Sequence, residues 1–272
     1  MLYSSMGSCF QVALFFLMSS LASFGVAAET ITLGGVGSLT PIVKLLGAEY
    51  VKKNPGVEIS VIEPPMGTGG GIRALAAGKV DVALSGRLLK ADETGQAKPW
   101  LQTPMVLATS GGAKNGVTRA EVAEIYAGRK TSWSDNKPIR LVLRGDKETE
   151  TAALRSMSPA VDAAVSDALN RPGLPIAEND LDALDVLTKI SGSLGSTTLG
   201  LVMATGAKLA VLPLDGVAPS IKTMEDGSYR LLRPYFVVTA PNPRPSVSAF
   251  VTWLNSPAAI SITRKLGYMP LK

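Results

Sequence analysis

Histidine is absent from the 272 residues of this chain, and the only cysteine is Cys9. Without histidine the chain lacks the commonest general base and the commonest zinc ligand, which excludes Ser-His-Asp and Cys-His catalysis. Cys9 lies in a segment that we expect to be removed, so the mature chain is expected to hold no thiol, no disulfide and no metal–thiolate site. We therefore expect neither a metal nor a cofactor.

Charge is also sparse. Charged residues make up 18% of the chain and the net charge is +5. The basic residues are spread along the sequence, without the Lys/Arg block of a nucleic-acid-binding arm, so we expect no nucleic-acid partner and only a weak preference for anions. Apolar residues reach 46%, which is ample for a packed core. The length allows one large domain or two of about 100–150 residues.

The N-terminus has the pattern of a secretory signal. Residues 10–24 are apolar, and small residues ending in Ala28 follow them. The run is shorter than the roughly 20 residues of a membrane span, and its small-residue end fits a cleavage site. We expect a signal peptide at residues 1–28, export to the periplasm and a mature start near Glu29. Residues 1–9 contain no Lys or Arg, so an uncleaved anchor stays open as an alternative.

The first part of the mature chain alternates between strands and helices. The pattern predicts strands at 30–35, 57–62 and 80–84, a helix at 41–53 and a helical run at 72–77. This order implies a parallel sheet with helices on its faces. Ligands of such sheets bind beyond the carboxyl ends of the strands. Ser38, the glycine-rich turn at 67–71 and Ser85 are all expected at that edge.

The later part continues with mixed elements. We predict strands at 105–110, 139–143, 199–204, 210–214 and 235–239, and helices at 118–127, 150–157, 159–190 (broken at 172–175) and 247–255. Thr118, followed by Glu121, has the spacing of a capping box.

Residues 64–87 (PPMGTGGGIRALAAGKVDVALSGR) are the most informative stretch. A helix that opens on a glycine-rich turn presents unpaired N–H groups to an anion, and a strand that ends in Ser-Gly-Arg adds further donors. A competing interpretation is the Gly-x-Gly-x-x-Ala dinucleotide fingerprint at 69–74, with Asp92 downstream. The two prolines before the turn oppose that interpretation. A P-loop is excluded because Lys79 is followed by Val80.

Seven segments, in this order, resemble the periplasmic phosphate-binding proteins of ABC transporters and the wider type II solute-binding superfamily. They are residues 35–41, 66–72, 80–87, 121–139 (with Trp133), the loop opening at Arg144, 194–202 and 226–234. No single segment is specific, but their order over the mature chain is.

The resemblance implies an α/β fold of the periplasmic-binding-protein type II class, with two α/β lobes joined by a two-strand hinge. Lobe I would comprise residues 29–104 plus 216–272, and lobe II residues 105–215. It also implies capture of an inorganic oxyanion, phosphate above others, for delivery to an ABC transporter permease. On this interpretation the protein is a monomer and not an enzyme.

Carried over residue by residue, the resemblance gives a set of candidate ligand-binding residues. The set is Ser38, Leu39, Gly70, Ser85, Arg87, Arg144, Thr149 and Thr151. The simpler interpretations are a local turn or helix cap at Ser38, a structural ion pair at Arg87 and helix caps at the two threonines. Trp133 is expected to pack in a core and not to touch the ligand.

Two departures from the family pattern bear on the ligand. Gly86 stands where members that bind phosphate tightly often have an aspartate after the serine. Residues 147–151 read KETET where the family usually has Gly-Ser-Gly-Thr. Glu148 or Glu150 would repel phosphate if aimed at it, or would otherwise face solvent. The alternatives are therefore another oxyanion (molybdate, tungstate or sulfate), a sensory or accessory protein with a decayed site, or an enzyme that uses Asp, Glu or Lys in the same cleft.

Overall fold

The computed structural model describes residues 28–111 and 115–271. The expected signal peptide lies, except for Ala28, outside the described residues. Within the described part, no helix combines the length and apolar character needed to cross a membrane.

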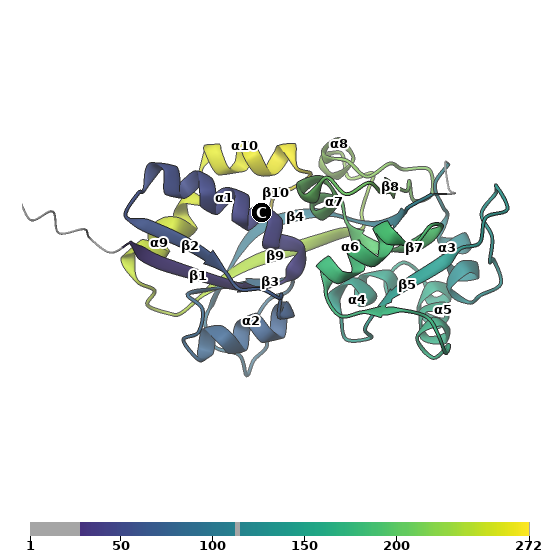
Figure 1. Ribbon diagram of the computed structural model, residues 1–272, viewed down its shortest axis with the longest axis horizontal. Helices are drawn as coiled ribbons and strands as arrows, with labels where there is room; N and C mark the ends of the chain where they lie inside the picture. Colours follow the sequence, from purple (N-terminus) through teal and green to yellow (C-terminus); the bar gives the residue numbers. More distant parts are fainter. Residues whose placement is uncertain (1–27, 112–114, 272) are drawn as a thin grey trace, which may run out of the picture.

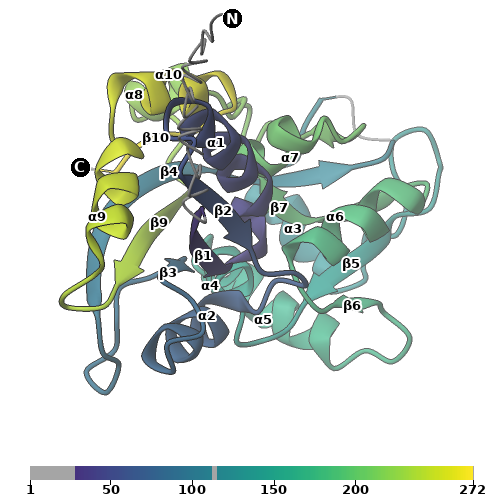
Figure 2. The same cartoon turned by 60° about the vertical axis from the view of Figure 1, so that its left-hand side comes forward.

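One lobe is built from the two ends of the described chain (Figure 1). Its elements are β1 (Glu29–Gly35), η1 (Gly37–Leu39), α1 (Thr40–Lys53), β2 (Val57–Val61), α2 (Gly67–Ala76), β3 (Val82–Ser85), α9 (Pro245–Trp253), α10 (Pro257–Lys265) and β10 (Met269–Pro270). β1 pairs in parallel with both β2 and β3, which confirms the expected parallel arrangement. Figure 2 shows α1 and α9 on one side of these strands and α2 on the other.

The other lobe is formed by the middle of the chain. Its elements are α3 (Arg119–Tyr126), β5 (Arg140–Arg144), α4 (Thr149–Arg155), α5 (Pro159–Leu169), β6 (Ile176–Ala177), α6 (Asp180–Lys189), β7 (Ser193–Thr198), α7 (Leu199–Thr205), β8 (Ala210–Val211) and α8 (Ile221–Glu225). β5 lies between β6 and β7 and is parallel to both. The expected capping box forms at the start of α3, where Thr118 and Glu121 bond each other's backbone N–H groups.

Two long strands run between the lobes, β4 (Gln96–Thr109) and β9 (Leu232–Thr239). They pair with each other, antiparallel, from Gln96 to Pro104 on the β4 side. From Met105 onward β4 pairs instead with β7 of the second lobe. The strand order is therefore β2-β1-β3-β9-β4-β7-β5-β6, and the crossing strands place the ends of both sets of parallel strands on either side of one cleft.

The position of the lobe boundary after residue 215 stays a prediction. Tyr229 is buried in the core of the second lobe, and its hydroxyl donates to the carbonyl of Met105. Leu231 and Leu232 pack against the same core. This packing favours a second boundary at the start of β9 rather than at Gly216.

Two sequence-based expectations are wrong in detail. Residues 199–204, expected as a strand, form helix α7, whose first turn is capped by the Thr198 hydroxyl. A short apolar run does not distinguish a buried strand from a buried helix. Residues 67–71 are already helical, as the start of α2. A Cβ on Gly71 would lie 2.8 Å from the Cα of Gly35, so this glycine allows close packing of α2 on β1.

Gly200, in the first turn of α7, provides a test of the packing between the lobes. A Cβ there would lie 2.1 Å from the ring of Tyr268, which is fully buried in the first lobe's core. We expect Gly200→Ala to lower the free energy of unfolding by about 1–3 kcal/mol or more, because neither backbone nor ring has room to move. Gly56→Ala is the matched control, since a Cβ at Gly56 meets nothing within 4 Å. Equal urea midpoints for the two variants would contradict this packing.

Candidate functional site

A cavity of about 380 Å³ lies between the lobes. The first lobe contributes the end of β1, the start of α2 and the loop after β3, and the second contributes the loop before α4 and the start of α6. The lining residues are Val36, Met66, Gly67, Thr68, Gly69, Gly70, Arg73, Arg87, Lys90, Lys147, Glu148, Thr149, Asp180 and Arg233. A smaller cavity of about 230 Å³ shares Gly67, Glu148 and Asp180 with it and reaches Arg144.

The cavity wall is predominantly cationic. Five lining residues are basic (Arg73, Arg87, Lys90, Lys147 and Arg233) and two are acidic (Glu148 and Asp180). Two of the five cations are engaged by carboxylates, since Arg87 pairs with Glu93 and Arg233 with Glu150. The remaining three have no ion-pair partner among the described residues. A cleft of this composition attracts anions.

Arg233 is the central cation of the site, and the sequence analysis gave it no role. It lies on β9, is almost fully buried, and pairs with Glu150 in the first turn of α4. Burial lowers the pKa of the Arg233 guanidinium. Its Nε is inaccessible to solvent and has no hydrogen-bond partner within residues 28–111 and 115–271. Glu150 therefore does not face solvent. Its carboxylate pairs with the buried guanidinium of Arg233.

Arg233 also explains Gly86. A Cβ on Gly86 would lie 3.1 Å from Arg233 Nη2 and 3.4 Å from Thr149 Oγ1. A Cβ at residue 86 is therefore a tight fit, and the Arg233 guanidinium has to shift by a few tenths of an ångström to admit it. Gly86, which stands where an aspartate was expected from the resemblance, leaves space for the Arg233 guanidinium at the cavity.

Arg144 ends β5 and is 5% exposed. It donates to the carbonyl of Ala177 (3.0 Å) and to the Glu148 carboxylate (3.2 Å). Its Nε is buried, and no hydrogen-bond partner for it lies in the part of the chain that the structure describes. The predicted residue therefore lies at the edge of the cleft with one donor unused, while another is occupied by Glu148.

Ser38 and Leu39 lie in η1, directly before α1. The Ser38 hydroxyl oxygen accepts a hydrogen bond from Tyr235 (2.8 Å), and its carbonyl accepts one from Tyr268 (3.2 Å). The Ser38 N–H donates to Asp180 Oδ2 at 3.1 Å. Leu39 packs its side chain into the first lobe's core. Here the main chain, and not the serine hydroxyl, faces the opposite lobe.

Ser85 and Arg87 form a local structure at the end of β3. The Ser85 hydroxyl bonds the carbonyl and the N–H of Arg87, and the residue is fully buried. The Arg87 guanidinium makes two 2.7 Å bonds to Glu93. Arg87 lines the cavity, but its guanidinium is already bonded to Glu93. This is the structural ion pair that the simpler interpretation of Arg87 expects.

The remaining predicted residues divide between the cavity and the protein interior. Gly70 and Thr149 line the cavity, and the Thr149 hydroxyl lies 3.5 Å from Glu150 Oε2. Thr151 is buried, and its hydroxyl donates to the carbonyl of Gly145 at 2.8 Å. Thr151 therefore supports the loop that carries Glu148 and does not face the cavity.

Asp180 is the second important residue that the sequence analysis missed. It begins α6, directly after the cap Asn179, and is 8% exposed. An acidic residue in the first turn of a helix is ordinary and stabilising, so nothing local distinguishes it. Only its contact with η1, 142 positions away in the sequence, marks it as part of the site.

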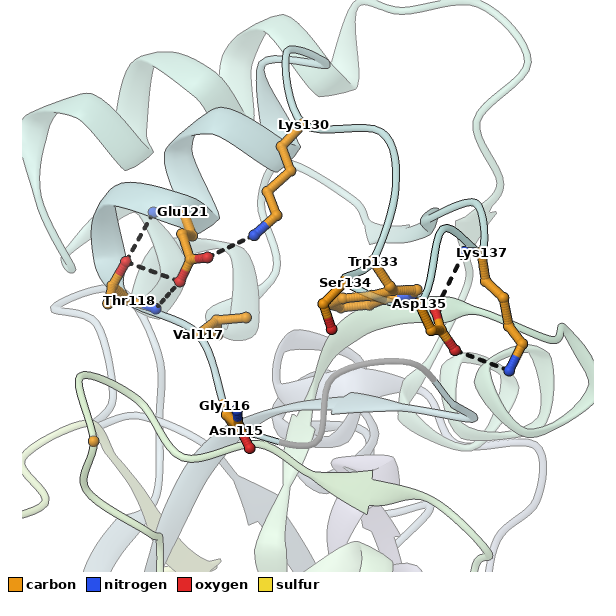
Figure 3. A pocket seen from close by; sticks show the side chains of 11 residues that line it. Asn115, Gly116, Val117, Thr118, Glu121, Lys130, Trp133, Ser134, Asp135 and Lys137 are labelled. Atoms are coloured by element: carbon orange, nitrogen blue, oxygen red, sulfur yellow. Dashed lines mark hydrogen bonds and ion pairs between the residues drawn. The ribbon is translucent and has the colours of Figure 1, made fainter.

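A larger cavity, of about 650 Å³, lies on the second lobe (Figure 3). Its charged residues neutralise one another, since Glu121 pairs with Lys130 and Asp135 with Lys137. Trp133 at its base is 4% exposed and belongs to the core, as expected. This cavity is less suited to an anion than the cleft. Over the described residues, no group of three or more acidic side chains is placed to hold a metal.

The fold and the cleft define a two-lobed α/β solute-binding protein of the type II class. The chain belongs to the PBP superfamily, whose domain matches residues 22–258. It is 23% identical to protein SphX of Synechococcus elongatus, covering 89% of this chain and 77% of that one. It is also 23% identical to the phosphate-binding protein PstS of Bacillus subtilis, covering 90% of this chain and 82% of the other.

A solved structure shares this fold. It is that of a putative phosphate ABC transporter substrate-binding protein with bound phosphate from Clostridium perfringens. The TM-score is 0.76 at 18% identity, over 90% of this chain and 100% of that one. The predicted two-lobed fold is thereby confirmed.

The Arg233–Glu150 pair gives a prediction for stability. Glu150→Gln removes one partner and leaves a buried, uncompensated guanidinium, so we expect the free energy of unfolding to fall by about 3–5 kcal/mol. Glu124→Gln is the matched control, because Glu124 also pairs with an arginine, Arg129, but does so on the surface. We expect that control to unfold like the parent protein. A Glu150→Gln variant that also unfolds like the parent would show that the pair is not buried.

The Arg87–Glu93 pair predicts a pH dependence. Hydrogen bonding to Arg87 lowers the pKa of Glu93 from its usual 4.5 to about 2. A lowered pKa stabilises the folded protein above the unfolded-state pKa, and this contribution is lost as the pH falls toward 2. The stability difference between the parent and Glu93→Gln should be constant above about pH 5 and should shrink between about pH 4.5 and 2. Urea titrations across this range measure it, and a difference that grows on acidification would exclude the assignment.

Proposed function

We propose that this protein captures an inorganic oxyanion, with phosphate favoured, in the cleft between its lobes. Two buried guanidinium groups, each with a partnerless Nε among the described residues, carry the proposal: Arg233 lines the cavity with the cationic wall, and Arg144 lines the smaller cavity beside it. Guanidinium groups with unused donors in a dry site suit a compact, multiply charged oxyanion. The first turn of α2, which opens into the same cavity, supplies N–H groups and the positive end of a helix dipole.

The family relationship supports the same ligand class. The Bacillus subtilis relative is named a phosphate-binding protein, and the structure from Clostridium perfringens holds phosphate. Binding of a solute between lobes requires no catalytic base, and the chain has no histidine. We therefore propose a transport receptor and not an enzyme.

We further propose how the receptor works in the cell. Residues 1–28 would direct export, and the mature monomer would work in the periplasm. There it would deliver the anion to an ABC transporter permease. The name of the Clostridium perfringens protein refers to an ABC transporter, which supports this context.

Isothermal titration calorimetry with phosphate, sulfate, molybdate and tungstate tests the ligand class. Arg144→Lys keeps the charge but removes the planar fork, so we expect phosphate affinity to fall about 10- to 100-fold. Arg140→Lys is the matched control, because Arg140 is at the exposed start of the same strand. Its affinity should equal that of the parent. Absence of heat with all four anions would overturn the oxyanion proposal and favour an accessory protein with a decayed site.

A further inference from the structure

The contact between Asp180 and η1 joins the two lobes across the cleft. Asp180 begins α6, whose Ala183, Leu184 and Leu187 pack in small clusters with residues of β5 and α7. Ser38 precedes α1 and is anchored in the other lobe, next to Leu39 in its core. The 3.1 Å bond from the Ser38 N–H to Asp180 Oδ2 therefore connects elements that belong to different lobes.

The donors that Asp180 occupies are held rigidly for an anion. Tyr235 and Tyr268 fix the hydroxyl and the carbonyl of Ser38, so the orientation of its N–H is determined by the first lobe alone. The N–H groups of Ser38 and Gly37 both stabilise the charged form of the Asp180 carboxylate. A Cβ on Gly37 would lie 3.2 Å from Asp180 Oδ2. The Asp180 carboxylate thus lies directly against the backbone of Gly37 and Ser38, with no intervening side chain.

We propose that Asp180 is an internal competitor for the cleft: its carboxylate occupies the η1 donors and holds the lobes together until an incoming anion displaces it. This inference rests on the proposed function, because it assumes that an oxyanion enters the same cleft. It assigns to Asp180 the role of setting affinity. The free energy gained when an anion binds is reduced by the free energy needed to release the Asp180 carboxylate from the η1 donors.

The surroundings of Asp180 favour its release. Burial raises the pKa of Asp180, and this effect exceeds the opposing effects of Arg144 and the backbone N–H groups. The charged carboxylate is therefore less stable in the cleft than in water. Asp180 also lines both cleft cavities, so an entering anion reaches it directly. A tetrahedral dianion carries more charge and more acceptor oxygens than a carboxylate. It can therefore bind the η1 donors more strongly than the Asp180 carboxylate that it displaces.

The test compares Asp180→Asn and Asp180→Ala with Asp185→Asn. Asp185 lies on the same helix, is exposed and pairs only with Lys189 on the surface. If the competing contact is present in more than about 90% of ligand-free molecules, its removal should raise phosphate affinity at least about tenfold. Asp185→Asn should leave the affinity unchanged. Weaker or unchanged phosphate binding in both Asp180 variants would overturn the competition and indicate that Asp180 contacts the ligand favourably or not at all.

Two measurements without ligand separate this inference from the proposed function. In the Asp180 variants, hydrogen exchange of the Ser38 amide should accelerate, and small-angle scattering should show a larger radius of gyration, because this contact between the lobes is lost. Asp185→Asn should change neither quantity. If no variant binds phosphate but both changes occur, the proposed ligand is wrong and the contact between the lobes stands. If neither change occurs, the contact does not hold the lobes together and the inference fails.

Discussion

The cleft depends on the burial of Arg233 between the lobes. A guanidinium this inaccessible is tolerated only with a close carboxylate partner, which Glu150 provides from the second lobe. Because Arg233 lies on a crossing strand, the pair fixes α4 against β9 at the position where the chain passes between lobes. The Arg233 guanidinium lies 3.1 Å from the position that a Cβ at residue 86 would take, so Gly86 leaves room for it.

Acidic side chains at three positions give the cleft its particular character. Glu148, Glu150 and Asp180 each engage a donor at the cleft, respectively Arg144, Arg233 and the main chain of Ser38. From the sequence, Glu148 and Glu150 were expected either to repel the ligand or to face solvent. The structure shows a third arrangement, in which carboxylates accept hydrogen bonds from donors at the cleft. Their number is smaller than that of the cations, so the cleft stays attractive to anions.

The sequence was sufficient for features that local patterns determine. The alternation of strands and helices up to residue 85 predicted the parallel strands, and parallel strands bring their carboxyl ends to one edge. This placed the start of α2 at the cleft correctly. Asp180 and Arg233 were missed because their roles depend on contacts across 142 and 83 positions. Residues 199–204 were misassigned because an apolar run of that length fits both strand and helix.

Under the proposed competition, an anion enters the cleft by displacing carboxylates that already occupy its donors. Desolvation of the cations costs little when a ligand enters, because Arg144 and Arg233 have lost most of their water in the folded protein. The affinity then depends on the difference in free energy between the hydrogen bonds that these donors make to an oxyanion and those that they make to Glu148, Glu150 and Asp180. A planar carboxylate presents its oxygens in one plane, whereas a tetrahedral anion presents them toward both lobes at once. Selectivity for tetrahedral anions can thus arise in this cleft from the geometry of exchange, without an aspartate at residue 86.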